Sequence, residues 1–249
     1  LRPIGGWRQR GTVDLNGVAR TITSWEDNDN NRRVAFGTYD KLYAMTSGDT
    51  ISDITPVGFT SGRVDATAFT GYGSSTFSNG LYGLPSEDTS NILTATTWSL
   101  ENWGEYLLGC TADDGKIYEW QLDAATPAAV LSNAPTSCSS MMVTEERFVF
   151  AFGANGDPRK VAWSDREDNN LWTPAATNEA GDIQIQTNGV ILAGLRTRGQ
   201  SLILTDQDAH TATYSGPPYV YGFERVGTSC GLIAANAAAS VDAGVMWMG

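Results

Sequence analysis

The sequence predicts an all-β fold: a β-propeller, or part of one, built from four-stranded antiparallel blades with an insertion between two of them. Two observations predict it. Short β-branched or aromatic runs bounded by Gly, Asp, Asn and Pro fill the chain, which is typical of strands. After a long first interval, the apolar centres of these runs are about 40–50 residues apart, the length of a propeller blade. The centres are Ala35, Leu108, Phe150, Ile203 and Met246.

Each repeat contains a predicted hairpin. The leading strands are expected at 34–37, 106–109, 148–153 and 201–204, and their partners at 41–45, 116–120, 160–163 and 210–214. A further run at 244–247 begins another unit. Asp-Gly and Asn-Gly in the connecting turns tolerate a positive φ and favour tight hairpins. The alternative fold for this pattern is a β-sandwich with irregular hairpins.

Prolines suggest where the repeating units end. Proline cannot donate to a strand ladder, so three units are predicted to close at Pro56, Pro135 and Pro174. The Ala-rich run 233–240 could form two helical turns, although its flanks favour strands.

The first interval exceeds a typical unit by roughly 30 residues, which predicts an inserted Gly/Ser/aromatic loop at about 57–96. Residues 71–83, GYGSSTFSNGLYG, carry no charge. Fixing so many glycines is entropically costly, so Tyr72, Phe77 and Tyr82 are expected to contact a neighbouring subunit. The alternative is a loop whose rings rest on their own blade.

The two ends suggest a portion of a longer protein. The chain starts at Leu1 rather than Met, and residues 245–249 resemble a strand cut short. Residues 1–249 are therefore expected to form part of a propeller domain in a longer polypeptide.

Composition excludes some function classes. The 249 residues include 16 Lys and Arg against 28 Asp and Glu, for a net charge of -12. This balance argues against a DNA-binding surface, which needs a basic stripe. Cys110, Cys138 and Cys230 are far apart and form no CxxC motif, so we expect reduced, mostly buried thiols rather than a zinc site or a disulfide framework.

No catalytic, cofactor-binding or metal-binding residue is predicted, and no cofactor. The single histidine, His210, lies on an alternating strand and is expected to be solvated or hydrogen-bonded there. Residues 27–31, DNDNN, space oxygen ligands as calcium loops do, but Arg32 and Thr38 stand where an EF-hand needs Gly and Glu. A turn stabilised by Asx side chains is the better interpretation.

Other acidic and aromatic residues are interpreted structurally. Asp113, Asp114, Asp206 and Asp208 are expected to be turn carboxylates. Tryptophans at regular places in the repeats are expected in blade cores, since large aromatic groups are mostly buried. They are Trp98, Trp103, Trp120, Trp163 and Trp172.

Several segments carry a family resemblance. They are 161–165 (VAWSD), 170–174 (NLWTP), 178–182 (NEAGD), 189–196 (GVILAGLR), 204–206 (LTD), 214–223 (YSGPPYVYGF) and 230–233 (CGLI). Together with 97–109 (TWSLENWGEYLLG) and 115–120 (GKIYEW), they resemble virion structural proteins of tailed bacteriophages, in particular tail nozzle and packaged-DNA-stabilisation proteins of short-tailed phages. The likeness covers about residues 148–249 and 97–120.

The resemblance implies a propeller-bearing subunit of a homo-oligomeric ring, usually a hexamer, around the DNA exit channel of the virion tail. It implies contacts with other tail proteins, such as adaptor and fibres, and with the host envelope. DNA would pass nearby without sequence-specific binding, and there would be no small-molecule substrate. The chain would be assembled in the host cytoplasm and would not be an enzyme.

Two alternatives of other classes stay open. One is a receptor- or glycan-binding tail fibre or hub protein, which predicts exposed Trp and Tyr in a groove. The other is a propeller glycan hydrolase, which requires two acids near the propeller axis, one with a raised pKa.

Overall fold

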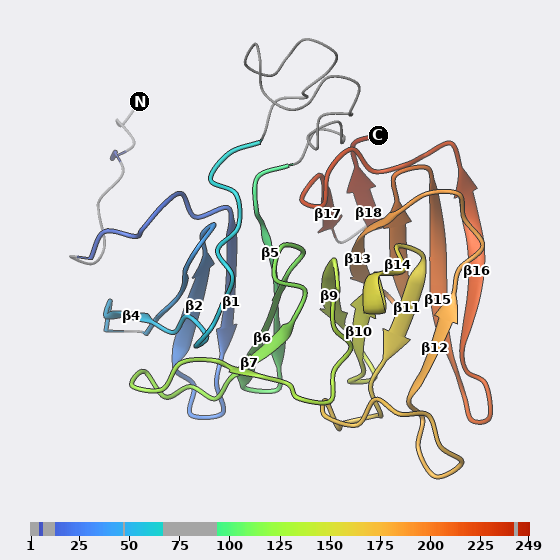
Figure 1. Cartoon of the computed structure of the whole chain (residues 1–249), viewed down its shortest axis with the longest axis horizontal. Coiled ribbons are helices and arrows are strands. Elements are labelled where there is room, and N and C mark those ends of the chain that lie inside the picture. Colours follow the sequence, from blue (N-terminus) through green and yellow to red (C-terminus); the bar gives the residue numbers. More distant parts are fainter. Residues whose placement is uncertain (1–4, 7–12, 47, 67–93, 242–243) are drawn as a thin grey trace, which may run out of the picture.

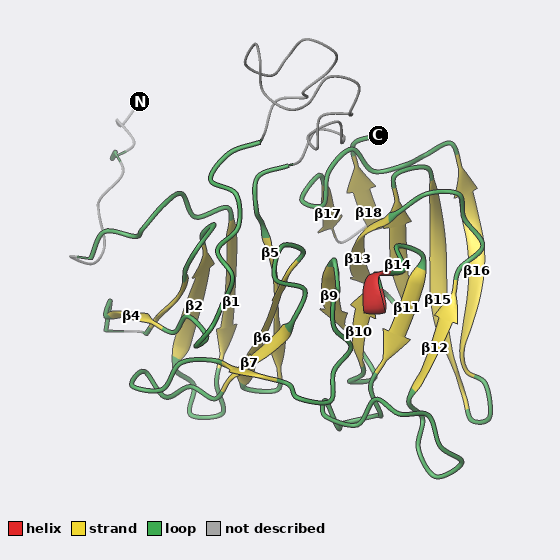
Figure 2. Ribbon diagram, in the orientation of Figure 1, coloured by secondary structure: helices red, strands yellow, loops and turns green. Residues whose placement is uncertain are grey.

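The computed structural model describes residues 5–6, 13–46, 48–66, 94–241 and 244–249, and these form part of a β-propeller. Four antiparallel sheets of four strands follow one another along the chain, and a two-stranded hairpin follows them. In Figure 1 the sheets stand side by side from β1 to β16 in the order of the sequence. In the described residues the only helical turn is Ala154–Gly156, between β10 and β11 (Figure 2).

Every sheet is a meander in which each strand pairs with the next. The strands of blade 1 are β1 (Thr21–Glu26), β2 (Arg32–Gly37), β3 (Leu42–Met45) and β4 (Ile51–Asp53). Those of blade 2 are β5 (Trp98–Trp103), β6 (Tyr106–Thr111), β7 (Ile117–Trp120) and β8 (Ala129–Val130). Those of blade 3 are β9 (Ser140–Val143), β10 (Val149–Phe152), β11 (Lys160–Trp163) and β12 (Gly181–Gln184). Those of blade 4 are β13 (Ile191–Thr197), β14 (Gln200–Thr205), β15 (Asp208–Gly216) and β16 (Val220–Thr228). The hairpin pairs β17 (Ala238–Val241) with β18 (Gly244–Trp247).

The first strand of each blade lies at the propeller axis. β1 lies against β5, β5 against β9, β9 against β13, and β13 against β17. The segment before β17 also reaches back to the first blade, where the side-chain amide of Asn236 donates to the carbonyl of Arg20 at 3.5 Å. The axis is therefore lined by strands from all four blades.

Four apolar clusters fill the seams between successive blades. Successive side chains of a strand point to opposite faces of the sheet, so one blade can pack against a neighbour on each side. On β9, Met141 and Val143 contact blade 2, whereas Met142 between them contacts the seam with blade 4. Both faces of a blade are thus apolar, which is why each blade needs a neighbour on either side.

The predicted hairpins are the second and third strands of blades 1 to 4, and the fold class is confirmed. The predicted insertion falls between β4 and β5; its residues 67–93, which include Tyr72, Phe77 and Tyr82, lie outside the described residues. One expectation was wrong, because Pro174 lies between β11 and β12 rather than at a blade exit. The Ala-rich run, for which the sequence allows either helical turns or a strand, contributes its residues 238–240 to β17 (Ala238–Val241).

A buried threonine recurs where the second strand of a blade ends. Thr38, Thr111 and Thr205 are fully buried. The hydroxyl of Thr38 accepts from the Lys41 amide at 3.0 Å, and that of Thr205 accepts from the Asp208 amide at 2.8 Å. These bonds close the turn into the third strand, a repeat signal that apolar spacing alone does not show.

The cysteines give a first prediction. Cys110 and Cys138 are buried and Cys230 is half-buried. Burial raises the pKa of Cys110 well above its ordinary value and that of Cys138 to about 12. Because the thiolate is the reactive form, only Cys230 is expected to react promptly with a thiol reagent at pH 8 in the native protein. Denaturation should expose all three, and Cys230→Ser should remove the prompt phase. Prompt native-state modification of Cys110 or Cys138 would contradict this.

Candidate functional site

A cavity of about 550 Å³ lies at the axis and is the candidate functional site. The beginnings of the innermost strands β1, β5, β9 and β13 line it, and the segment before β17 completes the wall. Its volume falls within the range of small-molecule pockets. In the part of the chain that the structure describes, this cavity joins residues from all four blades.

Two arginines enter the cavity wall from blade 1 and the segment that follows it. The Nη2 of Arg20 donates to the carbonyl of Val64 and, at 3.2 Å, to the carboxylate of Asp65. Arg63 forms an ion pair with Asp113 at 2.5 Å and donates from Nε to the carbonyl of Thr94 at 2.9 Å. Arg63 is therefore held in one orientation by two separate contacts.

The carboxylates of the cavity are paired. Asp113 also accepts a short hydrogen bond from the Thr96 hydroxyl, which itself accepts from the Arg63 amide at 2.7 Å. Glu101, on β5, forms an ion pair with Arg196 at 2.8 Å. Burial raises the pKa of Glu101 above its ordinary value, and the charge of Arg196 only partly offsets this.

Polar groups on β5 alternate with core residues. Trp98 and Leu100 point into the seam with blade 1. Thr97, Ser99 and Glu101 therefore share the opposite side of the strand, and all three line the cavity. β5 and the residue before it thus present two hydroxyls and a carboxyl on one side.

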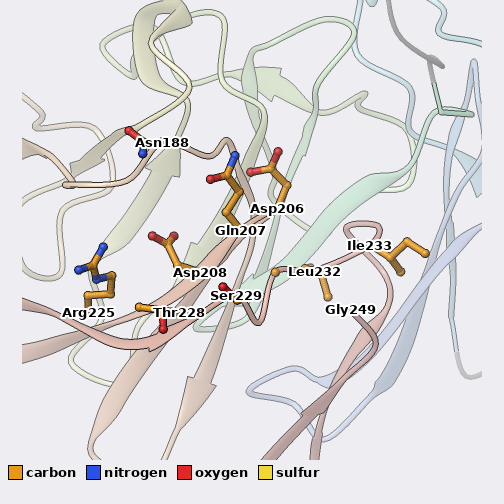
Figure 3. A pocket seen from close by; sticks show the side chains of 11 residues that line it. Asn188, Asp206, Gln207, Asp208, Arg225, Thr228, Ser229, Leu232, Ile233 and Gly249 are labelled. Atoms are coloured by element: carbon orange, nitrogen blue, oxygen red, sulfur yellow. The ribbon is translucent and has the colours of Figure 1, made fainter.

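A second cavity, of about 610 Å³, lies beside the turn between β14 and β15 (Figure 3). Asp206, Gln207 and Asp208 line it from this turn, and Thr228 and Ser229 line it from the end of β16. Asp208 accepts from the hydroxyls of Thr205 at 2.6 Å and Thr187 at 2.8 Å.

His210 is buried, and its Nε2 lies 3.2 Å from Oδ1 of Asp208, so it is a hydrogen-bonded strand histidine as predicted. The hydroxyls of Thr187 and Thr205 both donate to the same carboxylate. Neither hydroxyl is positioned as a nucleophile with His210 as its base.

Asp208 gives a prediction about pH. Burial by itself would raise its pKa, but the hydroxyls of Thr205 and Thr187 and the contact with His210 outweigh burial and hold the pKa below its ordinary value. Asp208→Asn is expected to lower the free energy of unfolding by about 1–3 kcal/mol at pH 7, because it weakens buried charge-assisted hydrogen bonds.

The sign of the pH dependence follows from the depressed pKa. The carboxylate stabilises the fold above its unfolded-state pKa of about 3.9, and this stabilisation is lost as pH falls through the folded-state value. Urea denaturation at several pH values should show the wild type and Asp208→Asn converging below about pH 4. Asp182→Asn, which removes a half-exposed ion pair with Lys160, is the control and should cost less than about 1 kcal/mol. A difference that does not change with pH would contradict the prediction.

Other residues singled out by sequence are structural. Asp27 accepts from the amides of Asp29 at 3.1 Å and Asn31 at 2.8 Å and pairs with Arg33 at 2.8 Å, which confirms the Asx turn. Asp114 bonds Lys116 and Tyr118 within its own hairpin. The five tryptophans expected in blade cores are all buried.

In the described ranges no group of three or more His, Cys, Asp or Glu side chains could hold a metal ion. In the same ranges no helix is long and apolar enough to cross a membrane.

Comparisons with known proteins find likeness at the level of structure. No family model and no curated protein matches the sequence. One similar solved structure is a selenomethionine-substituted virginiamycin B lyase from Staphylococcus aureus, at 9% identity and a TM-score of 0.46, covering 86% of this chain and 56% of that chain. Another is a streptogramin B lyase, at 13% identity and a TM-score of 0.32, covering 87% of this chain and 74% of that chain. The chain thus spans a little over half the length of the first.

These comparisons correct one expectation. Both similar structures are named as lyases, which contradicts the expectation that the chain is not an enzyme, and that expectation is withdrawn. At these TM-scores the likeness carries no argument about what this chain binds or converts.

Proposed function

We propose that the chain is a structural subunit of a bacteriophage tail, specifically of the nozzle ring around the DNA exit channel, where it helps to retain and release packaged DNA. The resemblance of residues 97–120 and 148–249 to such proteins supports the proposal. These stretches contain β5 to β7 and β10 to β18, so the likeness extends through three blades and the final hairpin.

Uncovered apolar side chains lie at both ends of the blade series. Met246, on β18, is 69% exposed, and Ile233 and Met248 beside the hairpin are similarly open. At the other end, Val18 and Val57 of the first blade and its flanks are exposed. Exposed apolar side chains that gather in a patch mark contacts, so both ends suit contact with further polypeptide, either of the same chain or of a neighbouring subunit.

The charge of the chain also suits a DNA channel. A wall that attracted phosphates would retard a sliding duplex, whereas a net charge of -12 favours repulsion. This support requires that acidic residues face the channel. A channel lined mainly by Arg and Lys would contradict it.

Locating the chain in the native virion tests the proposal. A map of the particle, or gold-labelled antibody against this chain, should place it in a ring at the distal end of the tail, and mass measurement should give six copies. Three copies would favour the fibre alternative. Density in the capsid shell or on a side fibre would refute the nozzle assignment.

A paired variant tests the exposed end. Met246→Lys combined with Met248→Lys should leave the isolated chain folded but reduce its incorporation into tails, because two charges replace apolar contact surface. Val130→Lys, at an exposed position on the outer strand of blade 2, is the matched control. Equal incorporation of the paired variant and the control would argue against a contact at β18.

The glycan hydrolase is a second candidate, favoured by the raised pKa of Glu101 in the same cavity as Asp113. A raised pKa shifts a carboxyl toward the protonated form that a general acid needs opposite a second carboxylate. If the chain cleaves host-envelope polysaccharide, Glu101→Gln and Asp113→Asn should each reduce the rate by about 100-fold or more. Cleavage that survives both substitutions, with melting temperatures unchanged, would exclude this pair.

A further inference from the structure

Arg20 has an unused donor in the axial cavity. Its guanidinium carries five N–H donors in a fixed planar fork. Nη2 donates to Val64 and Asp65, but Nη1 is buried and has no hydrogen-bond partner among the described residues. An unpaired buried donor is costly and rare in folded proteins. The Arg20 side chain lines the axial cavity and is 22% exposed, so its guanidinium keeps donor capacity beyond its bonds to Val64 and Asp65.

The charge around Arg20 leaves room for one further negative group. Arg63 is matched by Asp113, and Glu101 is matched by Arg196. The only ion-pair partner of Arg20 among the described residues is Asp65, whose side chain is 84% exposed. Solvent screens such a pair strongly, so the positive charge of Arg20 is the least compensated one in the cavity wall.

Hydroxyl groups complete the wall. Thr97, just before β5, and Ser99 on β5 line the cavity, and their hydroxyls make no hydrogen bond to other described residues. Hydroxyls can donate to carboxylate oxygens and can exchange hydrogen bonds with ligand hydroxyls. A cavity of about 550 Å³ accommodates a ligand of the size of a sugar.

We infer that the axial cavity binds a small, hydroxylated organic carboxylate, such as a sugar acid. The ligand carboxylate accepts from the Arg20 guanidinium, and Thr97 and Ser99 bond the ligand's other polar groups. The ligand occurs either as a free acid or as a residue of an acidic polysaccharide, and both present the same chemistry. This inference does not depend on the proposed role in a phage tail, so the result of locating the chain in the virion neither supports nor contradicts it.

Calorimetry with the full chain tests this site, with D-glucuronate as the probe and D-glucose as its neutral counterpart. Glucuronate should bind with a dissociation constant of about 10 μM to 1 mM, and glucose should not bind measurably. Arg20→Gln should weaken glucuronate binding about 10- to 100-fold, as expected for loss of a charge-assisted hydrogen bond. Arg32→Gln, an exposed arginine on β2 of the same blade, should bind like the wild type.

Further arms separate the alternatives. Thr97→Val combined with Ser99→Ala should weaken binding without changing the melting temperature by much, which supports a direct contact. A glucuronate-containing oligosaccharide that competes in wild type but not in Arg20→Gln identifies a polysaccharide as the source, and failure to compete identifies the free acid. No glucuronate binding at 10 mM, equal binding by Arg20→Gln, or equally tight binding of inorganic phosphate would overturn the inference.

Discussion

Phe150→Ala is expected to lower the free energy of unfolding by about 3–5 kcal/mol. Phe150 is fully buried on β10 and contacts the rings of Tyr221 at 4.8 Å between centroids, Trp163 at 6.2 Å and Phe152 at 6.3 Å. Truncation removes both the buried area and the edge-to-face contact with Tyr221. Because Tyr221 belongs to blade 4, the substitution loosens the seam between blades 3 and 4 as well as the interior of one blade.

Urea denaturation monitored by tryptophan fluorescence measures this loss. A domain is stabilised by only about 5–15 kcal/mol, so the variant should unfold at much lower urea. Phe150→Leu should retain most of the stability, and Tyr219→Ala, whose side chain is 82% exposed, should change it by less than about 0.5 kcal/mol. A loss below about 1 kcal/mol for Phe150→Ala would show that the aromatic cluster does not hold the two blades together.

Gly194→Val is expected to have the second-largest effect, a destabilisation of about 1–3 kcal/mol or more. Gly194 lies on β13 where the ring of Phe152 and the sulfur of Met142 approach its backbone. A Cβ at this position would lie 2.6 Å from the Met142 sulfur and closer still to the end of the Phe152 ring. Both side chains are buried in blade 3, so the added atoms would force the innermost strands of blades 3 and 4 apart.

Gly222→Val is the matched control for this prediction. Gly222 lies on β16 of the same blade, and a Cβ there would meet the Ser215 hydroxyl at 3.6 Å, an ordinary contact. That variant should keep a melting temperature within a few degrees of the wild type. A melting temperature of Gly194→Val equal to that of Gly222→Val would contradict the close packing of β13 against Met142 and Phe152.

Sequence alone identified the parts of the fold with apolar residues on both faces. The second and third strands of each blade, such as β10 and β11, lie between two seams and read as continuous apolar runs. The first strand of blade 1 escaped prediction because its TITSWE sequence mixes polar and apolar residues. The fourth strands are short and exposed, and β8 has only two residues, so they carry little signal. The prediction that Pro174 closes a unit was wrong because a proline turn can also connect two strands inside one blade, here β11 and β12.

The axial site could not be predicted from sequence. Arg20, Arg63, Glu101 and Asp113 belong to no local motif, and only the ring arrangement of the blades brings them to one cavity. The alternation of Thr97, Ser99 and Glu101 with Trp98 and Leu100 was a usable signal, since it marks a strand with one core face and one polar face. The order and arrangement of the blades decide which residues meet at a propeller axis. The spacing of apolar runs in the sequence indicates that arrangement only coarsely.

The contact between Asn236 and Arg20 has a consequence for how the molecule forms. Strand pairs within each blade join neighbours in the chain, whereas this contact joins residues 216 positions apart. Blades can therefore form in the order of synthesis, each offering an apolar face as a template for the next. The long-range contact and the axial cavity it helps to enclose come last. A nascent chain arrested before β17 would then carry four blades without a finished cavity, and ligand binding at the axis would report the completion of folding.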